Sequence, residues 1–136
     1  MLMPKKVKFR KSHRGDQIRG LATRKTALSF GTVGLKTLAA GWITSRQIEA
    51  ARRTITGHLQ RKGKLWIRIF PDKSVTVKGN EIRMGGGKGS VDHYVAPVKP
   101  GTIMFEIDGV ELDLARRALQ LAAYKMPVRT SIIYKS

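Results

Sequence analysis

Positive charge is the feature that most constrains this chain. Its 136 residues include 27 Lys and Arg against 9 Asp and Glu, a formal net charge of +18. Repulsion at this charge opposes a compact state, which favours folding and working beside a polyanion. Residues 1–88 carry 21 basic and 4 acidic side chains, a net +17, whereas residues 89–136 carry 6 and 5, a net +1. We therefore expect the polyanion contact in the first two thirds and a scaffold in the last third.

Composition excludes several classes of protein. The chain has no Cys, which rules out disulfides, thiolate metal sites and a Cys nucleophile. No apolar run approaches the ~20 residues of a membrane span, so we expect no membrane partner. The N-terminus lacks an apolar signal core. This favours the cytoplasm of a bacterium, with an organelle-encoded protein as the alternative.

The basic residues are densest at the N-terminus. Residues 1–25 hold nine cations against one acid, Asp16, and few large apolar side chains. Such a segment is typical of a basic arm that its partner orders. We predict an arm at 1–25, followed by a single domain at 26–136 that contains a glycine-rich loop at 79–90.

The clearest predicted helix covers residues 43–63. Thr44 and Gln47 have the spacing of a capping box, and Gly63 is placed to end the helix. A stripe at helical spacing consists of Ile48, Ala51, Ile55 and Leu59. Arg46, Arg53 and Arg61 point away from this stripe, and Arg52 borders it. Because few acids are available to pair with them, we predict that they contact phosphates rather than only solvent.

The rest of the domain alternates strand and turn patterns. Residues 27–42 suggest strand pieces broken by glycines. Residues 64–70 form a strand pattern, 71–73 a turn and 74–79 a returning strand. Trp66 and Phe70 are expected to pack in the core or on the second face of the sheet rather than stack on bases. Strands near 91–96, 102–108 and 128–134 flank a helix at 110–126 that Pro127 ends. These patterns predict an α+β fold, a mostly antiparallel, barrel-like sheet core with two main helices.

The segment RMGGGKGS, residues 83–90, raises the question of a phosphate-binding loop. A P-loop requires Gly five positions before the Gly-Lys pair and Ser or Thr directly after it, but Ile82 and Gly89 stand there. Glycines also allow one backbone to approach another closely. With Arg83 and Lys88 on either side, the segment suits a thin cationic finger for RNA; a plain hairpin tip is the alternative.

No catalytic or metal constellation is apparent. His13, His58 and His93 lack ligand spacing. The acids at the end of the 102–108 strand and the start of the next helix fit a structural role beside the helix dipole, namely Glu106, Asp108, Glu111 and Asp113. We expect no enzyme activity, cofactor, metal or small-molecule substrate. The main alternative is a cationic DNA-binding architectural protein, although no helix-turn-helix, basic zipper or zinc pattern is present.

Six stretches, in this order, resemble a known family: KFRKSHRG (8–15), SFGTVGLK (29–36), ITSRQIEAARR (43–53), LWIRIFPDK (65–73), IRMGGGKGS (82–90) and PGTIMFEIDGV (100–110). Together they resemble the bacterial large-subunit ribosomal protein sixteen family, the counterpart of the archaeal and eukaryotic L-ten proteins. The resemblance implies an α+β structural protein that binds large-subunit rRNA beside neighbouring ribosomal proteins. It also implies contact with A-site tRNA, with P-site tRNA as a further candidate, and a role in late subunit assembly and translation.

The charge pattern and the resemblance together give the candidate site residues. The candidate rRNA-binding residues are Lys5, Lys6, Lys8, Arg10, Lys11, Arg14, Arg46, Arg52, Arg53 and Arg61. The resemblance places His13 of the arm and Arg83, Met84, Gly85, Lys88 and Gly89 of the loop near tRNA. It also marks Arg83 as a candidate for hydroxylation.

Overall fold

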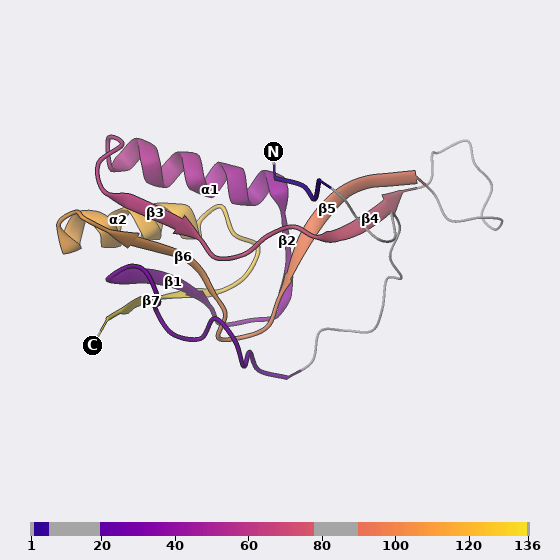
Figure 1. Ribbon diagram of the computed structural model, residues 1–136, viewed down its shortest axis with the longest axis horizontal. Coiled ribbons are helices and arrows are strands. Elements are labelled where there is room, and N and C mark those ends of the chain that lie inside the picture. Colours follow the sequence, from indigo (N-terminus) through magenta and orange to yellow (C-terminus); the bar gives the residue numbers. More distant parts are fainter. Residues whose placement is uncertain (1, 6–19, 78–89, 136) are drawn as a thin grey trace.

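The computed structural model describes residues 2–5, 20–77 and 90–135 (Figure 1). Most of the predicted arm and nearly all of the glycine-rich loop lie outside these residues. The elements, in chain order, are β1 (Val33–Thr37), β2 (Gly41–Thr44), α1 (Ser45–His58), β3 (Lys64–Ile67), β4 (Lys73–Val77), β5 (Ser90–Val98), β6 (Ile103–Asp108), α2 (Leu112–Ala123) and β7 (Thr130–Tyr134). The predicted α+β class with two main helices is confirmed.

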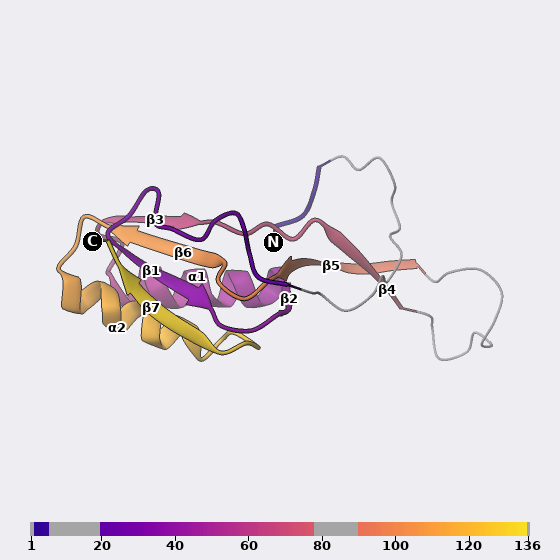
Figure 2. The ribbon, with the colours of Figure 1, turned by 90° about the horizontal axis from the view of Figure 1, so that it is seen from below.

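The strands form two antiparallel sheets. One has four strands in the order β3-β6-β1-β7, and the other has three in the order β2-β5-β4. Helices α1 and α2 lie together against the four-stranded sheet, and β4 and β5 form a ribbon that projects beyond the N-terminal end of α1 (Figures 1 and 2). The ribbon ends where Val77 pairs with Ser90, away from the helical layer.

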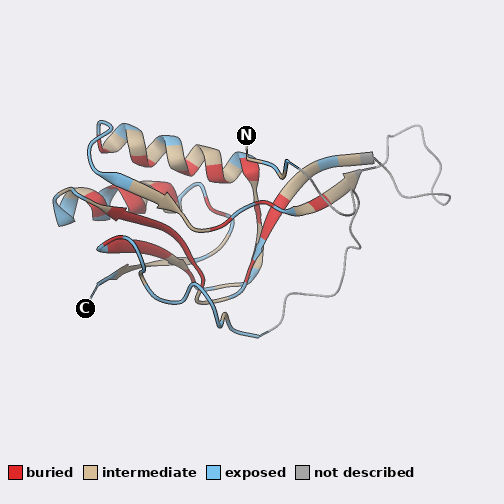
Figure 3. Ribbon diagram, in the orientation of Figure 1, coloured by how far each residue is buried: buried red, intermediate tan, exposed pale blue. Residues whose placement is uncertain are grey.

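The core lies between the helices and the four-stranded sheet. Val33 and Leu35 of β1 are fully buried, as expected for the sheet face that packs on helices, and Gly34 between them is buried as well. The central strand β6 is buried along Ile103–Ile107, on both of its faces (Figure 3). The last third of the chain, where charges balance, thus supplies the middle of the scaffold.

Helix α1 begins as the sequence predicts and ends earlier. The Gln47 backbone N–H donates to Thr44 Oγ1 at 3.1 Å, and the Thr44 N–H donates to Gln47 Oε1 at 2.9 Å, which confirms the capping box. The predicted end at Gly63 is wrong. Gln60 adopts a left-handed φ of 53°, and the Arg61 N–H donates to Thr56 O at 3.0 Å, which closes the helix as a Schellman motif without glycine.

One other boundary and one strand pairing differ from the prediction. Helix α2 covers Leu112–Ala123 rather than 110–126, so it ends before Pro127. The expected pairing of 74–79 with the preceding strand is also wrong, because β3 pairs with β6 whereas β4 pairs with β5. Between them the chain crosses from one sheet to the other, with Ile69 and Pro71 buried. A local turn pattern could not reveal that the two strands belong to different sheets.

Candidate nucleic-acid interface

Five of the predicted rRNA-binding residues lie in the described part of the chain. Arg46 and Arg53 are exposed on α1, Arg52 is half-buried there, Arg61 is exposed in the turn after it, and Lys5 is exposed near the N-terminus. The other predicted members lie outside the described residues: Lys6, Lys8, Arg10, Lys11 and Arg14 of the arm, and the tRNA-proximal His13, Arg83, Met84, Gly85, Lys88 and Gly89. The stripe Ile48, Ala51, Ile55 and Leu59 is buried, as predicted.

The N-terminal residues meet the start of α1. Leu2 and Met3 line a hollow of about 340 Å³ together with Arg46, His93 and Tyr94. His93 Nδ1 lies 2.6 Å from Asp92 Oδ2. Arg46 therefore lies close to the point where the basic arm begins in sequence, so that the arm and the helix can contribute cations to one surface.

Glu49 forms ion pairs with two of the α1 arginines, Arg52 and Arg53. Arg52 Nε donates to Glu49 Oε2 at 3.0 Å, and Arg53 Nε donates to Glu49 Oε1 at 3.1 Å. The Arg52 hydrogen bond, with further help from Arg53, outweighs burial and lowers the pKa of Glu49 to about 2. The expectation that these arginines have few acids to pair with is wrong for Arg52 and Arg53. Arg53 nevertheless remains 76% exposed, so its guanidinium keeps donors available for a phosphate.

Glu106 forms a constellation that the sequence pattern did not reveal. Its side chain is fully buried, and Oε1 accepts the backbone N–H groups of Ser29 (3.0 Å), Phe30 (2.9 Å) and Gly31 (2.9 Å). Oε2 accepts from the Arg68 guanidinium. The sequence signal that could have indicated a buried, paired carboxylate is a single acid within the otherwise apolar strand 103–107. The structural role predicted for it holds, but through these partners rather than through a helix dipole.

The pKa of Glu106 reflects competing effects. Burial raises it, but hydrogen bonds from Gly31 and Phe30, then from the Arg68 side chain and Ser29, outweigh burial and hold the pKa below its ordinary value. The carboxylate is thus charged inside the protein, where a paired and fully hydrogen-bonded ion is tolerated. It fixes residues 29–31 against the edge of β6.

An aromatic cluster lies over this carboxylate. The Phe30 ring stacks on Trp66 with centroids 5.8 Å apart, and the Arg68 guanidinium lies 5.0 Å from the Phe30 centroid. The prediction that Trp66 packs within the protein is consistent with this stack. The same prediction for Phe70 is wrong, because this ring is 46% exposed.

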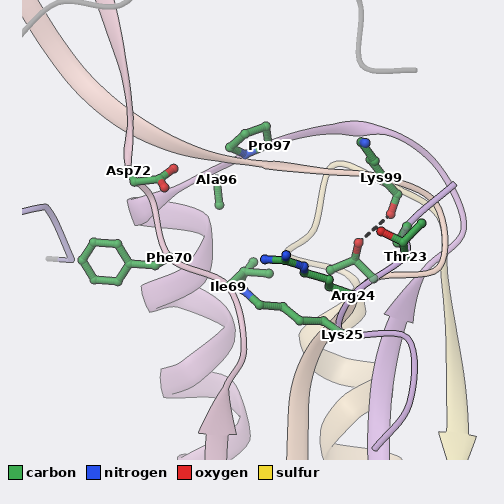
Figure 4. Close-up of a pocket in the computed structure, with 11 residues that line it drawn as sticks. Thr23, Arg24, Lys25, Ile69, Phe70, Asp72, Ala96, Pro97 and Lys99 are labelled. Atoms are coloured by element: carbon green, nitrogen blue, oxygen red, sulfur yellow. Dashed lines mark hydrogen bonds between the residues drawn. The ribbon is translucent and has the colours of Figure 1, made fainter. Parts of the chain in front are cut away.

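A second cationic hollow is lined by no residue of α1. It has a volume of about 430 Å³, and its lining includes Arg24, Lys25, Lys99 and Phe70 (Figure 4). None of these residues was among the predicted site residues. Charge density alone did not single them out, because the sequence does not show that residues 24–25 and 99 meet.

No group of three or more His, Cys, Asp or Glu side chains among the described residues is arranged to hold a metal ion. None of the helices in the described part is both long and apolar enough to cross a membrane. What the fold presents is a rigid α+β scaffold with exposed arginines on one helix and a basic hollow. These features define a basic scaffold protein, the class expected to work beside a polyanion.

Comparison with known proteins identifies the family. Residues 4–133 match the family described as ribosomal protein L16p/L10e, and the chain belongs to it. It is 58% identical over 133 residues to the large ribosomal subunit protein uL16c of Cyanidium caldarium, covering 98% of this chain and 94% of that protein. It is 59% identical over 135 residues to uL16c of Phaeodactylum tricornutum (99% and 97%), and 56% identical over 133 residues to uL16c of Physcomitrium patens (98% and 96%).

This membership confirms the resemblance inferred from the six sequence stretches. The chain is a structural protein of a large-subunit ribosomal family and is not an enzyme. Binding of rRNA and a part in translation follow from the family.

Proposed function

We propose that this chain binds large-subunit rRNA through its basic arm and the outward face of α1, and presents its glycine-rich loop to tRNA. The observation that carries the proposal is the division of α1, where a fully buried apolar stripe faces the core and Arg46 and Arg53 face outward. The rRNA-binding set is that of the sequence analysis: Lys5, Lys6, Lys8, Arg10, Lys11, Arg14, Arg46, Arg52, Arg53 and Arg61.

The β4–β5 ribbon supports the part of the proposal that concerns tRNA. Residues 78–89 join the paired ends Val77 and Ser90, which lie at the projecting end of the ribbon (Figure 1). We propose that Arg83, Met84, Gly85, Lys88 and Gly89, with His13 of the arm, contact A-site tRNA and reach toward P-site tRNA. We further propose that the chain joins late in assembly, next to other large-subunit proteins.

The test of rRNA binding is a charge reversal on α1. Arg53→Glu should weaken binding to large-subunit rRNA and shift the tagged protein away from the large subunit in a sucrose gradient at moderate salt, because phosphate contacts are salt-sensitive. Arg117→Glu, an equal charge change at an exposed position of α2, is the matched control and should leave sedimentation unchanged. Equal effects of both changes, or no effect of Arg53→Glu, would count against α1 as the rRNA-binding face.

The test of the loop is Arg83→Ala. The variant should enter large subunits normally but reduce tRNA-dependent activity of the ribosomes that contain it. Loss of incorporation would instead show that Arg83 binds rRNA during assembly. Mass spectrometry of the peptide that contains Arg83 would show whether an added oxygen marks hydroxylation there.

The relatives also bear on location. They share the name uL16c, used for chloroplast-encoded large-subunit proteins, which favours the organelle-encoded alternative over the bacterial cytoplasm. Fractionation of the source cells tests this: the protein should be found with organelle ribosomes, and its recovery with cytoplasmic ribosomes would support the bacterial assignment.

A further inference from the structure

The cationic hollow of Figure 4 lies between an N-terminal segment and the crossing from β3 to β4. Arg24, Lys25 and Lys99 supply its positive charge, and Ile69, Phe70 and Pro97 supply its apolar surface. Its volume of about 430 Å³ lies within the ~300–1,000 Å³ usual for a site that holds one small organic group. No sequence motif marks this combination of cations and an exposed ring.

The backbone fixes the cationic side of the hollow. The Ala22 N–H donates to Pro100 O at 3.0 Å, and Lys25 O accepts from the Ile103 N–H at 2.8 Å. Between these bonds Lys25 adopts a φ of 58°, which is uncommon for a residue with a long side chain and persists only where the surroundings impose it. In Figure 4 the side chains of Arg24 and Lys25 both extend toward Ile69. The two charges are therefore presented together by a strained, well-held backbone.

Within the described part of the chain, no ion pair neutralises the cations of the hollow. Asp72 also lines the hollow, but in the described part of the chain no ion pair joins it to Arg24, Lys25 or Lys99. Exposed cations gathered at one place attract a phosphate, which they can bind with several donors at once. The single carboxylate remains available as an acceptor for an N–H donor.

The apolar side offers a ring for stacking. Phe70 is 46% exposed, although its neighbours Ile69 and Pro71 are buried. In Figure 4 the Phe70 ring lies on the other side of Ile69 from Arg24 and Lys25, so the ring and the cations occupy different ends of the hollow. Proteins use an exposed aromatic ring and cations within one site for unpaired nucleotides, since the base stacks on the ring while the phosphate meets the charges. A duplex does not suit this hollow, because its bases are stacked on one another. An acidic peptide would use the cations but leave the ring without a partner.

We propose that this hollow binds one unpaired nucleotide of large-subunit rRNA. Arg24 and Lys25 contact the phosphate, Phe70 stacks on the base, and Asp72 accepts a hydrogen bond from an amino group of the base, which favours adenine, guanine or cytosine over uracil. The proposal rests on the proposed rRNA binding and extends it to a second surface, separate from the arginines of α1.

The direct test is photocrosslinking from position 70. The full chain, with a photoreactive phenylalanine analogue in place of Phe70, is incorporated into large subunits free of tRNA and irradiated. A crosslink to an unpaired rRNA nucleotide is expected. The same analogue in place of Tyr124, which is 78% exposed at the C-terminal end of α2, is the control and should not reach that nucleotide. A crosslink from position 70 to a protein, or none, would overturn the proposal.

RNA binding by the free chain distinguishes the nucleotide site in the hollow from the proposed rRNA binding on the large subunit. With a single-stranded RNA oligonucleotide of mixed sequence, Phe70→Ala should weaken binding about fivefold or more, as for the loss of one base–aromatic stack. Arg24→Gln should lower the salt dependence by about one phosphate contact. If the chain sediments with large subunits but neither variant changes binding or crosslinking, only the hollow proposal fails. If it does not sediment with them yet both effects appear, only the proposed placement on the subunit fails.

Discussion

The backbone N–H of Gly31 donates to Oε1 of Glu106 at 2.9 Å, joining a loop before β1 to the middle of β6, 75 residues further along the chain. The same oxygen accepts the N–H groups of Ser29 and Phe30, and Arg68 pairs with the other oxygen. A single carboxylate therefore holds a loop, a strand edge and an aromatic stack together. This part of the fold should be sensitive to small chemical changes.

Glu106→Gln should strongly destabilise the protein. The amide can still accept backbone hydrogen bonds, but it leaves the Arg68 guanidinium, whose side chain is only 14% exposed, without a counter-charge. Breaking such a buried pair costs about 3–5 kcal/mol. Denaturant unfolding followed by circular dichroism would measure the loss, with Glu111→Gln at the exposed start of α2 as a matched control. Similar stabilities for the two variants would show that the pair contributes little.

Acid should destabilise the protein through two carboxylates. The folded pKa of Glu49 is lowered from 4.5 to about 2, and that of Glu106 also lies below 4.5. A lowered folded pKa stabilises the protein above the unfolded pKa, and this stabilisation disappears as the pH falls through the folded value. The free energy of unfolding should therefore decline below pH 4.5, for Glu49 down to pH of about 2. Glu106→Gln should flatten this decline; an unchanged slope would contradict the assignment to Glu106.

Two glycines should respond in opposite ways to alanine. A Cβ at Gly31 would lie 2.6 Å from the backbone oxygen of Ile107, so Gly31→Ala should cost about 1–3 kcal/mol by forcing the loop away from β6. A Cβ at Gly57 of α1 meets no atom within 4 Å, so Gly57→Ala should stabilise the helix by about 0.5–1 kcal/mol. Thermal and denaturant unfolding of both variants would check the signs. A tolerated Gly31→Ala would mean that the close approach to β6 relaxes at little cost.

Glu49→Gln should strengthen rRNA binding. The change releases Arg52 and Arg53 from their shared acid, and exposed pairs of this kind are worth about 0.2–1 kcal/mol. Affinity for large-subunit rRNA should rise by about two- to fivefold at moderate salt, measured by filter binding. Glu111→Gln changes the net charge equally but lies on α2, so it should have a smaller effect. Equal gains from both variants would show that net charge acts without regard to position.

The sequence was most informative where local chemistry decides the structure. Thr44 and Gln47 placed the start of α1 because a capping box requires only neighbouring residues. The buried stripe from Ile48 to Leu59 followed from helical spacing. The end of α1 was missed because Gln60 takes a left-handed conformation usually left to glycine, which a rule based on residue type does not anticipate.

The sequence was least informative where distant segments meet. The strand pairing of β4 with β5, the role of Glu106 and the hollow around Phe70 all depend on contacts between residues far apart in the chain. Of the predicted site, the structure places Arg46, Arg52, Arg53 and Arg61 on or next to α1, and their contact with rRNA remains a prediction. Lys5 is exposed near the N-terminus, whereas the other predicted arm residues and the loop residues lie outside the described part of the chain; the roles of all of them remain predictions.

Among the described residues, Glu106 is the only carboxylate that is fully buried. This protein carries a net charge of +18, yet the negative charge that orders residues 29–31 comes from its own strand and not from RNA. The Phe30–Trp66 stack is therefore formed before any partner arrives, and the entropy of ordering it is not subtracted from the free energy of binding. This part of the surface is therefore pre-organised for binding in a crowded assembly.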